Sequence, residues 1–301
     1  MSEITIIKAQ NPADRAAFST FPWKLYQDDP LWVPPLYPDL KQALDPAQGT
    51  FLQRGEADLF LAYKDGRLAG TICAAEDPPT NRNRGTSECV FGFFDYIEDF
   101  DVFRALVETA RDWGRSRGLT LLYGPWNLDY ENAYGVLVEG RDVPPALMCG
   151  HSPPYYHLFM ERFGFQPARA ENVALRIDLE DSPRFDRLAR IADRVRGQGK
   201  ITIRSAEFDR WYPWNYLQLL WLMKTRQPAC LAVKSVLVLP EFWNTGVIVL
   251  LMDEMVKRAK SQGYEWIDMS ITSADNPTSV LTAEKMGAEI YKRWQVYHYP
   301  I

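Results

Sequence analysis

The chain has 301 residues, of which 47% are hydrophobic and 24% are charged, and its formal net charge is -5. This composition is that of a folded globular protein and excludes a disordered chain, and the length predicts two domains at about 150 residues each. Because no basic block offsets the acidic balance, the sequence also argues against a nucleic-acid-binding protein that neutralises phosphates.

The cysteines and the apolar runs indicate the cellular compartment of the protein. Cys73, Cys89, Cys149 and Cys230 lack the spacing of metal ligands, so no metal site is predicted. The opening MSEITIIKAQ lacks the charged and then apolar pattern of a secretory signal. The apolar run 247–252 is far too short to cross a bilayer. We therefore expect a reduced, cytoplasmic protein without a membrane segment.

The first elements are a strand and a capped helix. Residues 3–9 alternate as in a strand, and Asn11 with Asp14 predicts the start of a helix that runs up to the stretch DDPLWVPPLYPDL. The prolines around Trp32 forbid a regular helix there. This stretch either covers the core, with Trp32 and Tyr37 as packing anchors, or forms a loop beside a ligand cleft.

A hairpin and an amphipathic helix follow. An Asp-Gly pair between the apolar runs 58–63 and 67–75 predicts a β-hairpin, and residues 89–96 predict a third strand. The next helix carries one apolar stripe at helical spacing, formed by Phe103, Leu106, Val107, Ala110 and Trp113.

The elements up to about residue 180 are predicted to form the first domain, residues 1–180. Its last parts are a strand at 119–123, a helix from Pro154 and a strand at 173–179. Residues 181–199 are predicted to be a linker or a helix that leads to the second domain.

The second predicted domain, residues 200–301, is short. Between the strands predicted at 201–205 and 231–239 there is one helical stretch, 209–227, which leaves no room for the hairpin of the first domain. We expect its sheet to be completed by the first domain or by a partner chain, as in a homodimer, because exposed sheet edges are usually covered.

Residues 235–297 carry the most informative pattern: an apolar strand, a Pro-Glu turn, a helix opened by Gly246, a strand, a helix capped by Asn276 and a final strand. This order resembles that of the GCN5-related N-acetyltransferases (GNAT). The segments FPWKLYQDDPLWVPPL, GPWNLDYENAYGVLVEG, PPYYHLFMERFGF and LPEFWNTGV also resemble an uncharacterised group of tandem acetyltransferase-like proteins. The resemblance implies an α/β (α+β) fold of two tandem GNAT-like mixed sheets flanked by helices, the second truncated.

The turn before the second domain's Gly-opened helix is the candidate cofactor site. A helix start offers free backbone N–H groups and a positive dipole end, which can hold a pyrophosphate without a basic side chain. The residues at this start are Asn244, Thr245, Gly246 and Val247. The resemblance implies that the cofactor is acetyl-CoA or another acyl-CoA.

The resemblance also implies contacts to the pantetheine arm. It places the backbone of Leu237 and Leu239 beside pantetheine and Asn276 near the arm, although Asn276 is equally explained as a plain helix cap. The family's turn usually begins with Arg or Gln and ends with Gly or Ala. Here Trp243 and Ile248 stand at these positions, and a β-branched Ile248 is expected to crowd the phosphate.

The corresponding turn of the first domain has no glycine. Glu98, Asp99 and Asp101 lie where a pyrophosphate would bind and would repel it. Asp99 and Asp101 are better explained as caps of the following helix.

Candidate proton-transfer residues are few. The resemblance places a tyrosine four residues before a helix-ending glycine, but Met160 and Ala283 occupy these positions and neither donates a proton. Tyr155 and Tyr156 lie on the same helix as Met160 but nine and eight residues before Gly164, which is about two turns and therefore too early. We take Tyr156 as the candidate acid, with packing in the core or a cleft as the alternative.

The segment GPWNLDYENAYG is the candidate substrate pocket, because aromatic rings among amides and carboxylates on irregular backbone are typical of small-molecule sites. Glu131 is the candidate general base, since partial desolvation would raise its pKa towards neutrality. Packing alone also explains the segment. The predicted lining residues are Trp126, Asn127, Tyr130, Asn132 and, across from them, Tyr155.

The predicted function is acyl-CoA-dependent N-acylation of a small amine. The alternative is a catalytically inactive ligand-binding or scaffold protein with the same fold, because fold alone does not carry function. A third is amide formation with another acyl donor. Asp268 and Ser270 are either a base site near the cofactor or the polar face of a half-buried strand.

Overall fold

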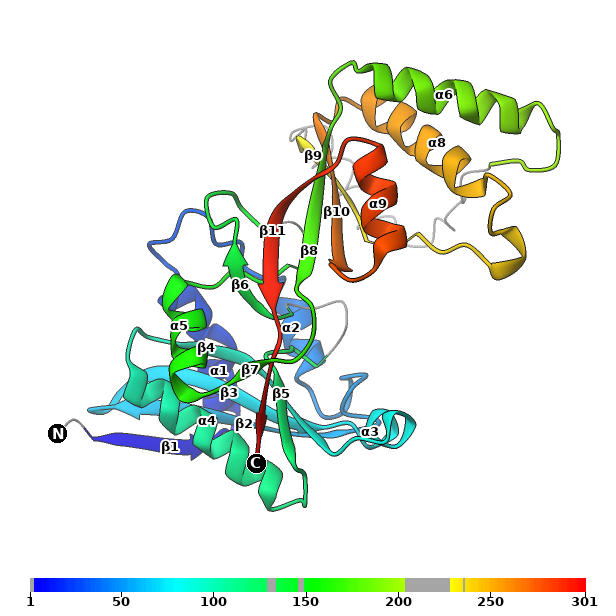
Figure 1. Cartoon of the computed structure of the whole chain (residues 1–301). Coiled ribbons are helices and arrows are strands. Elements are labelled where there is room, and N and C mark those ends of the chain that lie inside the picture. Colours follow the sequence, from blue (N-terminus) through cyan, green and yellow to red (C-terminus); the bar gives the residue numbers. More distant parts are fainter. Residues whose placement is uncertain (1–2, 129–133, 146–148, 204–227, 235) are drawn as a thin grey trace. The chain divides into compact units, whose positions relative to one another are not determined.

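The computed structural model describes residues 3–128, 134–145, 149–203, 228–234 and 236–301 (Figure 1). The chain forms two compact units: unit 1 comprises residues 1–172 and 292–301, and unit 2 comprises residues 173–291. Compared with the predicted ranges 1–180, 181–199 and 200–301, the last residues of the chain lie in unit 1. The predicted linker contains helix α6 (Pro183–Arg196), which belongs to unit 2.

Unit 1 is built on a seven-stranded mixed sheet. Its strands, in order of position, are β1 (Ile4–Lys8), β2 (Glu56–Lys64), β3 (Arg67–Glu76), β4 (Glu88–Tyr96), β5 (Leu121–Gly124), β12 (Tyr297–Pro300) and β7 (Gln166–Pro167). The first four are antiparallel, whereas β4 and β5 are parallel. The predicted hairpin is confirmed, and Asp65 and Gly66 both have the positive φ that a type I′ turn requires.

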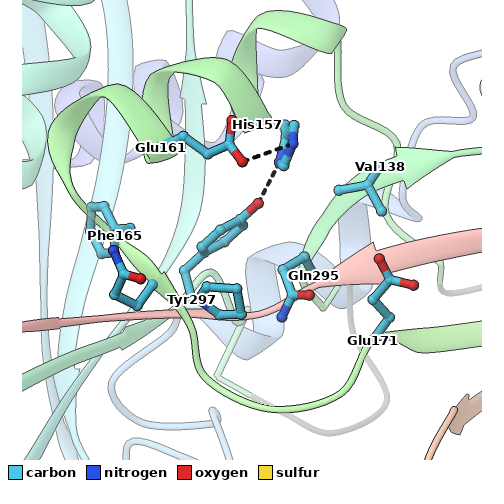
Figure 2. Close-up of a pocket in the computed structure, with 9 residues that line it drawn as sticks. Val138, His157, Glu161, Phe165, Glu171, Gln295 and Tyr297 are labelled. Atoms are coloured by element: carbon cyan, nitrogen blue, oxygen red, sulfur yellow. Dashed lines mark hydrogen bonds and ion pairs between the residues drawn. The ribbon is translucent and has the colours of Figure 1, made fainter.

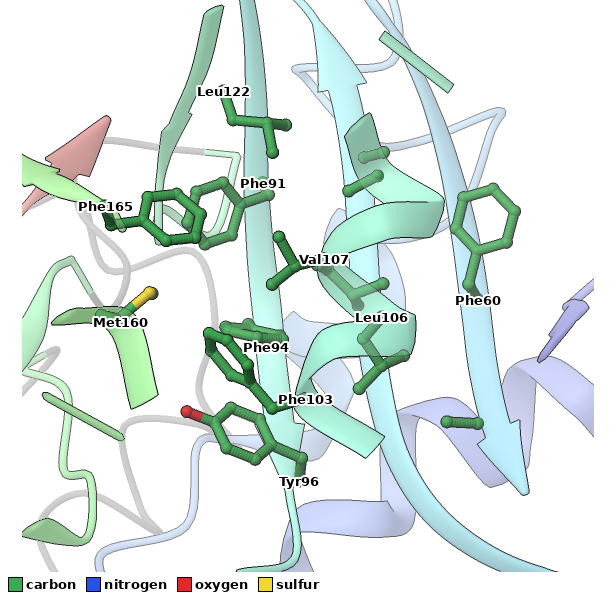
Figure 3. Packing of buried hydrophobic residues seen from close by; sticks show 14 of the residues in the cluster. Phe60, Phe91, Phe94, Tyr96, Phe103, Leu106, Val107, Leu122, Met160 and Phe165 are labelled. Carbon is green, nitrogen blue, oxygen red and sulfur yellow. The ribbon is translucent and has the colours of Figure 1, made fainter. Parts of the chain in front are cut away.

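Side chains of the hairpin alternate between two cores, one on each face of the sheet. Phe60 and Ile72 face the core that α4 (Phe100–Arg115) and α5 (Pro154–Phe163) cover (Figure 3). Leu61 and Cys73 face the other core, which contains residues of α1 (Pro12–Leu25). The whole predicted stripe of α4 is buried. Helices on both faces confirm the predicted fold class.

The remaining elements of unit 1 are α2 (Tyr37–Ala43), α3 (Pro78–Arg84) and β6 (Val136–Glu139). Asn11 caps α1 by accepting a hydrogen bond from the backbone N–H of Asp14, as predicted. In the proline-rich stretch, the Trp32 ring stacks on the Tyr26 ring, with 5.2 Å between the ring centroids, and contacts the Trp23 ring edge-on. These contacts support the packing interpretation of Trp32.

Unit 2 contains β8 (Asn172–Asp178), β9 (Cys230–Val233), β10 (Trp266–Ser273), the 3-10 helix η1 (Pro240–Phe242), α8 (Val247–Ser261) and α9 (Pro277–Lys285). The sheet order is β6-β11-β8-β10-β9, and β9 and β10 are parallel. Strand β11 (Glu289–Gln295) continues into unit 1, where its Arg293–Gln295 end pairs with β6. Apolar residues of β8, α8, β10 and α9 form the core of unit 2.

Several strands near the predicted domain boundaries differ from the prediction in their bounds or in the sheet that they join. Strand β8, from the predicted first domain, supplies a strand to the second sheet. The strand predicted at 231–239 ends at Val233, and the predicted final strand divides into β11 and β12, which lie in different sheets. Residues 201–203 form no strand. The rest of that predicted strand and the helix predicted at 209–227 lie outside the described residues.

No helix in the described part of the chain combines the length and the apolar character needed to cross a bilayer.

Candidate functional site

The parallel strand β9 of unit 2 pairs with only the first part of β10. Their pairing ends at Val233 and Met269, while β10 continues to Ser273. The described residues between β9 and η1 have no strand conformation, and the Leu237 and Leu239 side chains are 91% and 61% exposed. The contacts of Leu237 and Leu239 to pantetheine stay a prediction.

Helix α8 of unit 2 begins with a glycine. Gly246 has φ +85° and is the N-cap, and no side chain caps the helix. The first turn of α8 also carries no acidic residue. The first N–H groups of a helix have no partner within the helix. Val247 and the next residues therefore present N–H groups and a positive dipole end that suit a phosphate.

The residues around Gly246 explain how the turn forms. Asn244 has a left-handed φ of 62°, and the exposed Thr245 hydroxyl donates to the Phe242 carbonyl at 2.6 Å. The Ile248 side chain packs against the core of unit 2. The expectation that Ile248 crowds a bound phosphate stays a prediction.

Asn276 acts as the N-cap of α9. Its side-chain oxygen accepts a hydrogen bond from the backbone N–H of Ser279 at 3.3 Å. The cap explanation thus accounts for this residue, and a contact with pantetheine stays a prediction.

The corresponding helix start in unit 1 is already occupied by a carboxylate. Asp99 caps α4 by accepting from the backbone N–H groups of Asp101 at 2.9 Å and Val102 at 3.2 Å, and it pairs with Lys64. Although partial burial would raise the pKa of Asp99, the hydrogen bonds from Lys64 and Val102 hold that pKa below its usual value. A negative charge therefore remains where a phosphate would bind.

Backbone groups of β4 in unit 1 are also hydrogen-bonded to other parts of the chain. The backbone N–H of Trp126 donates to the Phe91 carbonyl at 2.7 Å, and the Asn127 side chain accepts from the N–H of Phe93 at 2.6 Å. The Tyr155 hydroxyl donates to the Tyr96 carbonyl at 2.7 Å. These backbone groups of β4 are consequently unavailable to a pantetheine arm.

Tyr156 lies in a buried polar cluster with Tyr26 and Asp95. Its hydroxyl accepts from the N–H of Tyr96 at 3.1 Å and lies 3.0 Å from the Tyr26 hydroxyl, which donates to Asp95 at 2.8 Å. Burial raises the pKa of Asp95 to about 6, although hydrogen bonds from Tyr26 and Tyr156 oppose the rise. Sequence reasoning missed Asp95, whose only local signal is an acid within the apolar strand FGFFDY.

The predicted substrate pocket is described only in part. Trp126 is buried, and its ring lies edge-on to the Tyr134 ring, with 6.0 Å between the ring centroids. Tyr155 packs against the core that α4 and α5 cover. The structure thus places Trp126, Asn127, Tyr155 and Tyr156 in packing or backbone-binding positions. The other predicted residues, Tyr130, Glu131 and Asn132, lie outside the described residues.

The strand β10 of unit 2 carries a buried carboxylate. Asp268 on β10 is fully buried and accepts from Tyr291 at 2.8 Å and from Ser270. Both residues proposed for a base site near the cofactor are therefore engaged in internal hydrogen bonding. Over the described residues, no group of three or more His, Cys, Asp or Glu side chains is arranged to hold a metal ion.

Comparison with known sequences links the chain to acyltransferases. Residues 155–288 match the sequence model of the acetyltransferase (GNAT) family. The chain is 35% identical over 169 residues to a bacterial ceramide synthase of Caulobacter vibrioides, covering 56% of this chain and 44% of that protein. It is 34% identical over 197 residues to protein YghO of Escherichia coli, covering 64% and 49%. The chain thus spans about half the length of these relatives.

Solved structures share the fold over nearly the entire chain. A tandem GNAT protein from the clavulanic acid biosynthesis pathway matches with a TM-score of 0.60 at 13% identity, covering 99% of this chain and 98% of that chain. A GCN5-related glucosamine N-acetyltransferase region of a fungal β-N-acetylglucosaminidase matches with a TM-score of 0.58 at 11% identity, covering 99% and 38%. Residues 155–288 thus match the GNAT family in sequence, and the chain shares the fold of a tandem GNAT protein.

Proposed function

We propose that the chain is an acyl-CoA-dependent N-acyltransferase that binds its cofactor at the α8 turn of unit 2. The match of residues 155–288 to the GNAT family supports acyl-CoA as the donor. One relative is named a ceramide synthase, and a ceramide contains an amide that joins an acyl chain to an amino group. This name supports an amine as the acceptor.

The contrast between the two helix starts carries the proposal. In unit 2, α8 begins at a glycine with no side-chain cap and no acid in its first turn. In unit 1, α4 begins at Asp99, whose carboxylate occupies the N–H groups. Because a pyrophosphate needs free N–H groups and no competing negative charge, unit 2 is the favoured cofactor unit.

The reaction is a substitution at the thioester carbonyl. A neutral amine attacks the carbonyl carbon, the new C–N bond forms, and the C–S bond breaks. Coenzyme A leaves as a thiolate and takes up the proton that the amine nitrogen loses. Holding the two reactants together supplies a large part of such a rate enhancement.

A second candidate function is cofactor binding without turnover. Met160 and Ala283 stand at the two positions where the family's tyrosine acid would lie, and both side chains are buried and apolar. Neither residue can protonate a leaving thiolate. This observation favours a binding protein that kept the fold, and a turnover assay separates the two functions.

The cofactor site is tested at Thr245 with two variants of nearly equal shape. Thr245→Asp adds a negative charge beside the expected pyrophosphate, whereas Thr245→Asn adds none. Both remove the hydroxyl that bonds the Phe242 carbonyl, so their comparison isolates the charge. An acid beside a helix start is compatible with the helix dipole, so we expect both variants to fold.

Calorimetric titration with coenzyme A should show binding at least tenfold weaker for Thr245→Asp than for Thr245→Asn. In the unaltered protein, coenzyme A at 100 times its dissociation constant should add about 2.7 kcal/mol to the free energy of unfolding. Equal affinities for the two variants would place the cofactor elsewhere. Thiol release from acetyl-CoA or a longer acyl-CoA with added amines then tests turnover, and binding without release would favour the second candidate.

A further inference from the structure

Unit 1 contains a cavity of about 450 Å³ that is separate from the Asp95 cluster (Figure 2). Its lining comes from β6, α5, the residue between α5 and β7, β7 itself, the segment after β7, β11 and β12. These residues are Val138, His157, Glu161, Phe165, Gln166, Pro167, Glu171, Gln295 and Tyr297. A cavity of this volume lies in the range that accommodates small organic ligands.

Gln295 can present only its carbonyl oxygen to the cavity. Its side-chain nitrogen donates to the carbonyl of Arg169 at 3.0 Å and to the carbonyl of Val296 at 2.7 Å. An amide NH₂ group has two hydrogens, so both are used within the protein. The orientation of this amide is fixed, and the group acts towards a ligand as an acceptor.

Tyr297 and Glu161 hold the ring of His157 from two sides. The Tyr297 hydroxyl bonds His157 Nδ1, and His157 Nε2 lies 3.4 Å from a Glu161 carboxylate oxygen (Figure 2). Burial, followed by the nearby carboxylates of Glu161 and Glu171, raises the pKa of Tyr297. The phenol therefore stays protonated and can donate to Nδ1, which directs the Nε2 hydrogen towards Glu161.

The two carboxylates of the cavity differ in how far they are neutralised. Glu171 pairs at 3.0 Å with Arg293, which is permanently charged. Glu161 has the His157 ring as its neighbour, and that ring is a full counter-charge only when protonated. Glu161 consequently offers the stronger attraction to an added cation. Val138, Phe165 and Pro167 add apolar surface to the same cavity.

We propose that this cavity is a binding site for a small organic amine, whose ammonium group bonds Glu161 and the Gln295 carbonyl while its apolar part lies against Phe165. The Glu161 carboxylate and the Gln295 carbonyl are hydrogen-bond acceptors, which suit an ammonium donor. An anion would be repelled by the carboxylates of Glu161 and Glu171. An amine is also the acceptor class of the proposed acyl transfer. The inference itself rests on unit 1 alone.

Binding is tested by calorimetric titration of the full chain with three probes of similar shape: 2-phenylethylamine, 2-phenylethanol and phenylacetate. At neutral pH the amine is a cation, the alcohol is neutral and phenylacetate is an anion. We expect the amine to bind at least ten times more tightly than the alcohol, and phenylacetate not to bind. Because coenzyme A is absent, this result is independent of the cofactor site.

Two variants assign the binding to this cavity. Glu161→Gln should weaken amine binding at least fivefold and leave the alcohol unchanged. Glu139→Gln is the matched control, because the Glu139 side chain is exposed to a similar extent as that of Glu161, 66% against 59%, but does not line the cavity. This control should keep the amine affinity within twofold. Equal binding of amine and alcohol, or an unchanged amine affinity in Glu161→Gln, would overturn the proposal.

Discussion

Asp95 shows how burial changes the chemistry of a single side chain. It lies on β4 between Phe94 and Tyr96, and the Tyr26 hydroxyl bonds its carboxylate at 2.8 Å. Burial raises the pKa of Asp95 to about 6 in the folded protein, against roughly 3.9 for an unperturbed aspartate. The folded state therefore binds this proton more readily than the unfolded state does. Stability linked to this group is full below about pH 4 and is lost as the pH rises through 6.

Asp95→Asn removes this titration while keeping an oxygen that accepts from Tyr26. The free energy of unfolding of the variant, relative to the unaltered protein, should be higher at pH 7.5 than at pH 4.5 by on the order of 2 kcal/mol. Urea denaturation at the two pH values measures this difference. The same relative stability at both values would mean that Asp95 ionises normally in the folded protein.

At the scale of the element, the start of α8 depends on Gly246 for two reasons. The residue has φ +85°, which side-chain-bearing residues rarely adopt, and an added Cβ would lie 2.8 Å from a methyl group of Val195 in α6. A substitution such as Gly246→Val therefore cannot remove cofactor binding without disturbing the packing of α6 on α8. Thr245, which is exposed, is the better position for a binding test.

Gly246→Ala should lower the free energy of unfolding by about 1–3 kcal/mol, through the strained backbone and the crowding of Val195. The double variant Gly246→Ala with Val195→Ala separates these causes, because it relieves the crowding but not the backbone strain. We expect a less than additive loss in the double variant. If urea denaturation gave Gly246→Ala a free energy of unfolding within 0.5 kcal/mol of that of the unaltered protein, the close packing of Gly246 on Val195 would be contradicted.

At the scale of the whole molecule, each sheet contains a strand from the other half of the sequence. Strand β8 follows β7 in the chain but lies between β11 and β10 in the second sheet. Strand β12 comes from the C-terminal end and lies between β5 and β7 in the first sheet. Tyr297 on β12 is fully buried and contacts Phe165. Unit 1 is thus closed only when the last residues of the chain are in place.

Deletion of residues 297–301 should therefore destabilise unit 1 before unit 2. Without β12, the strands β5 and β7 lose their shared neighbour, and exposed strand edges are prone to pairing with other chains. Hydrogen exchange should show lost protection in β5 and retained protection in β10, which pairs with β9. Unchanged protection in β5 would show that its sheet does not depend on the C-terminal strand.

Local signals in the sequence were sufficient to predict the hairpin at Asp65-Gly66, the buried stripe of α4, the Asn11 and Asn276 caps and the helix opened by Gly246. Each rests on residues a few positions apart, whose spacing determines a turn, a cap or an apolar face. Only the tertiary structure decided the sheets of β8 and β12, the bonding of Tyr156 to Asp95 and the meeting of His157 with Tyr297. These contacts join segments far apart in the chain. A strand's own residues encode its two faces but not the neighbour that it pairs with.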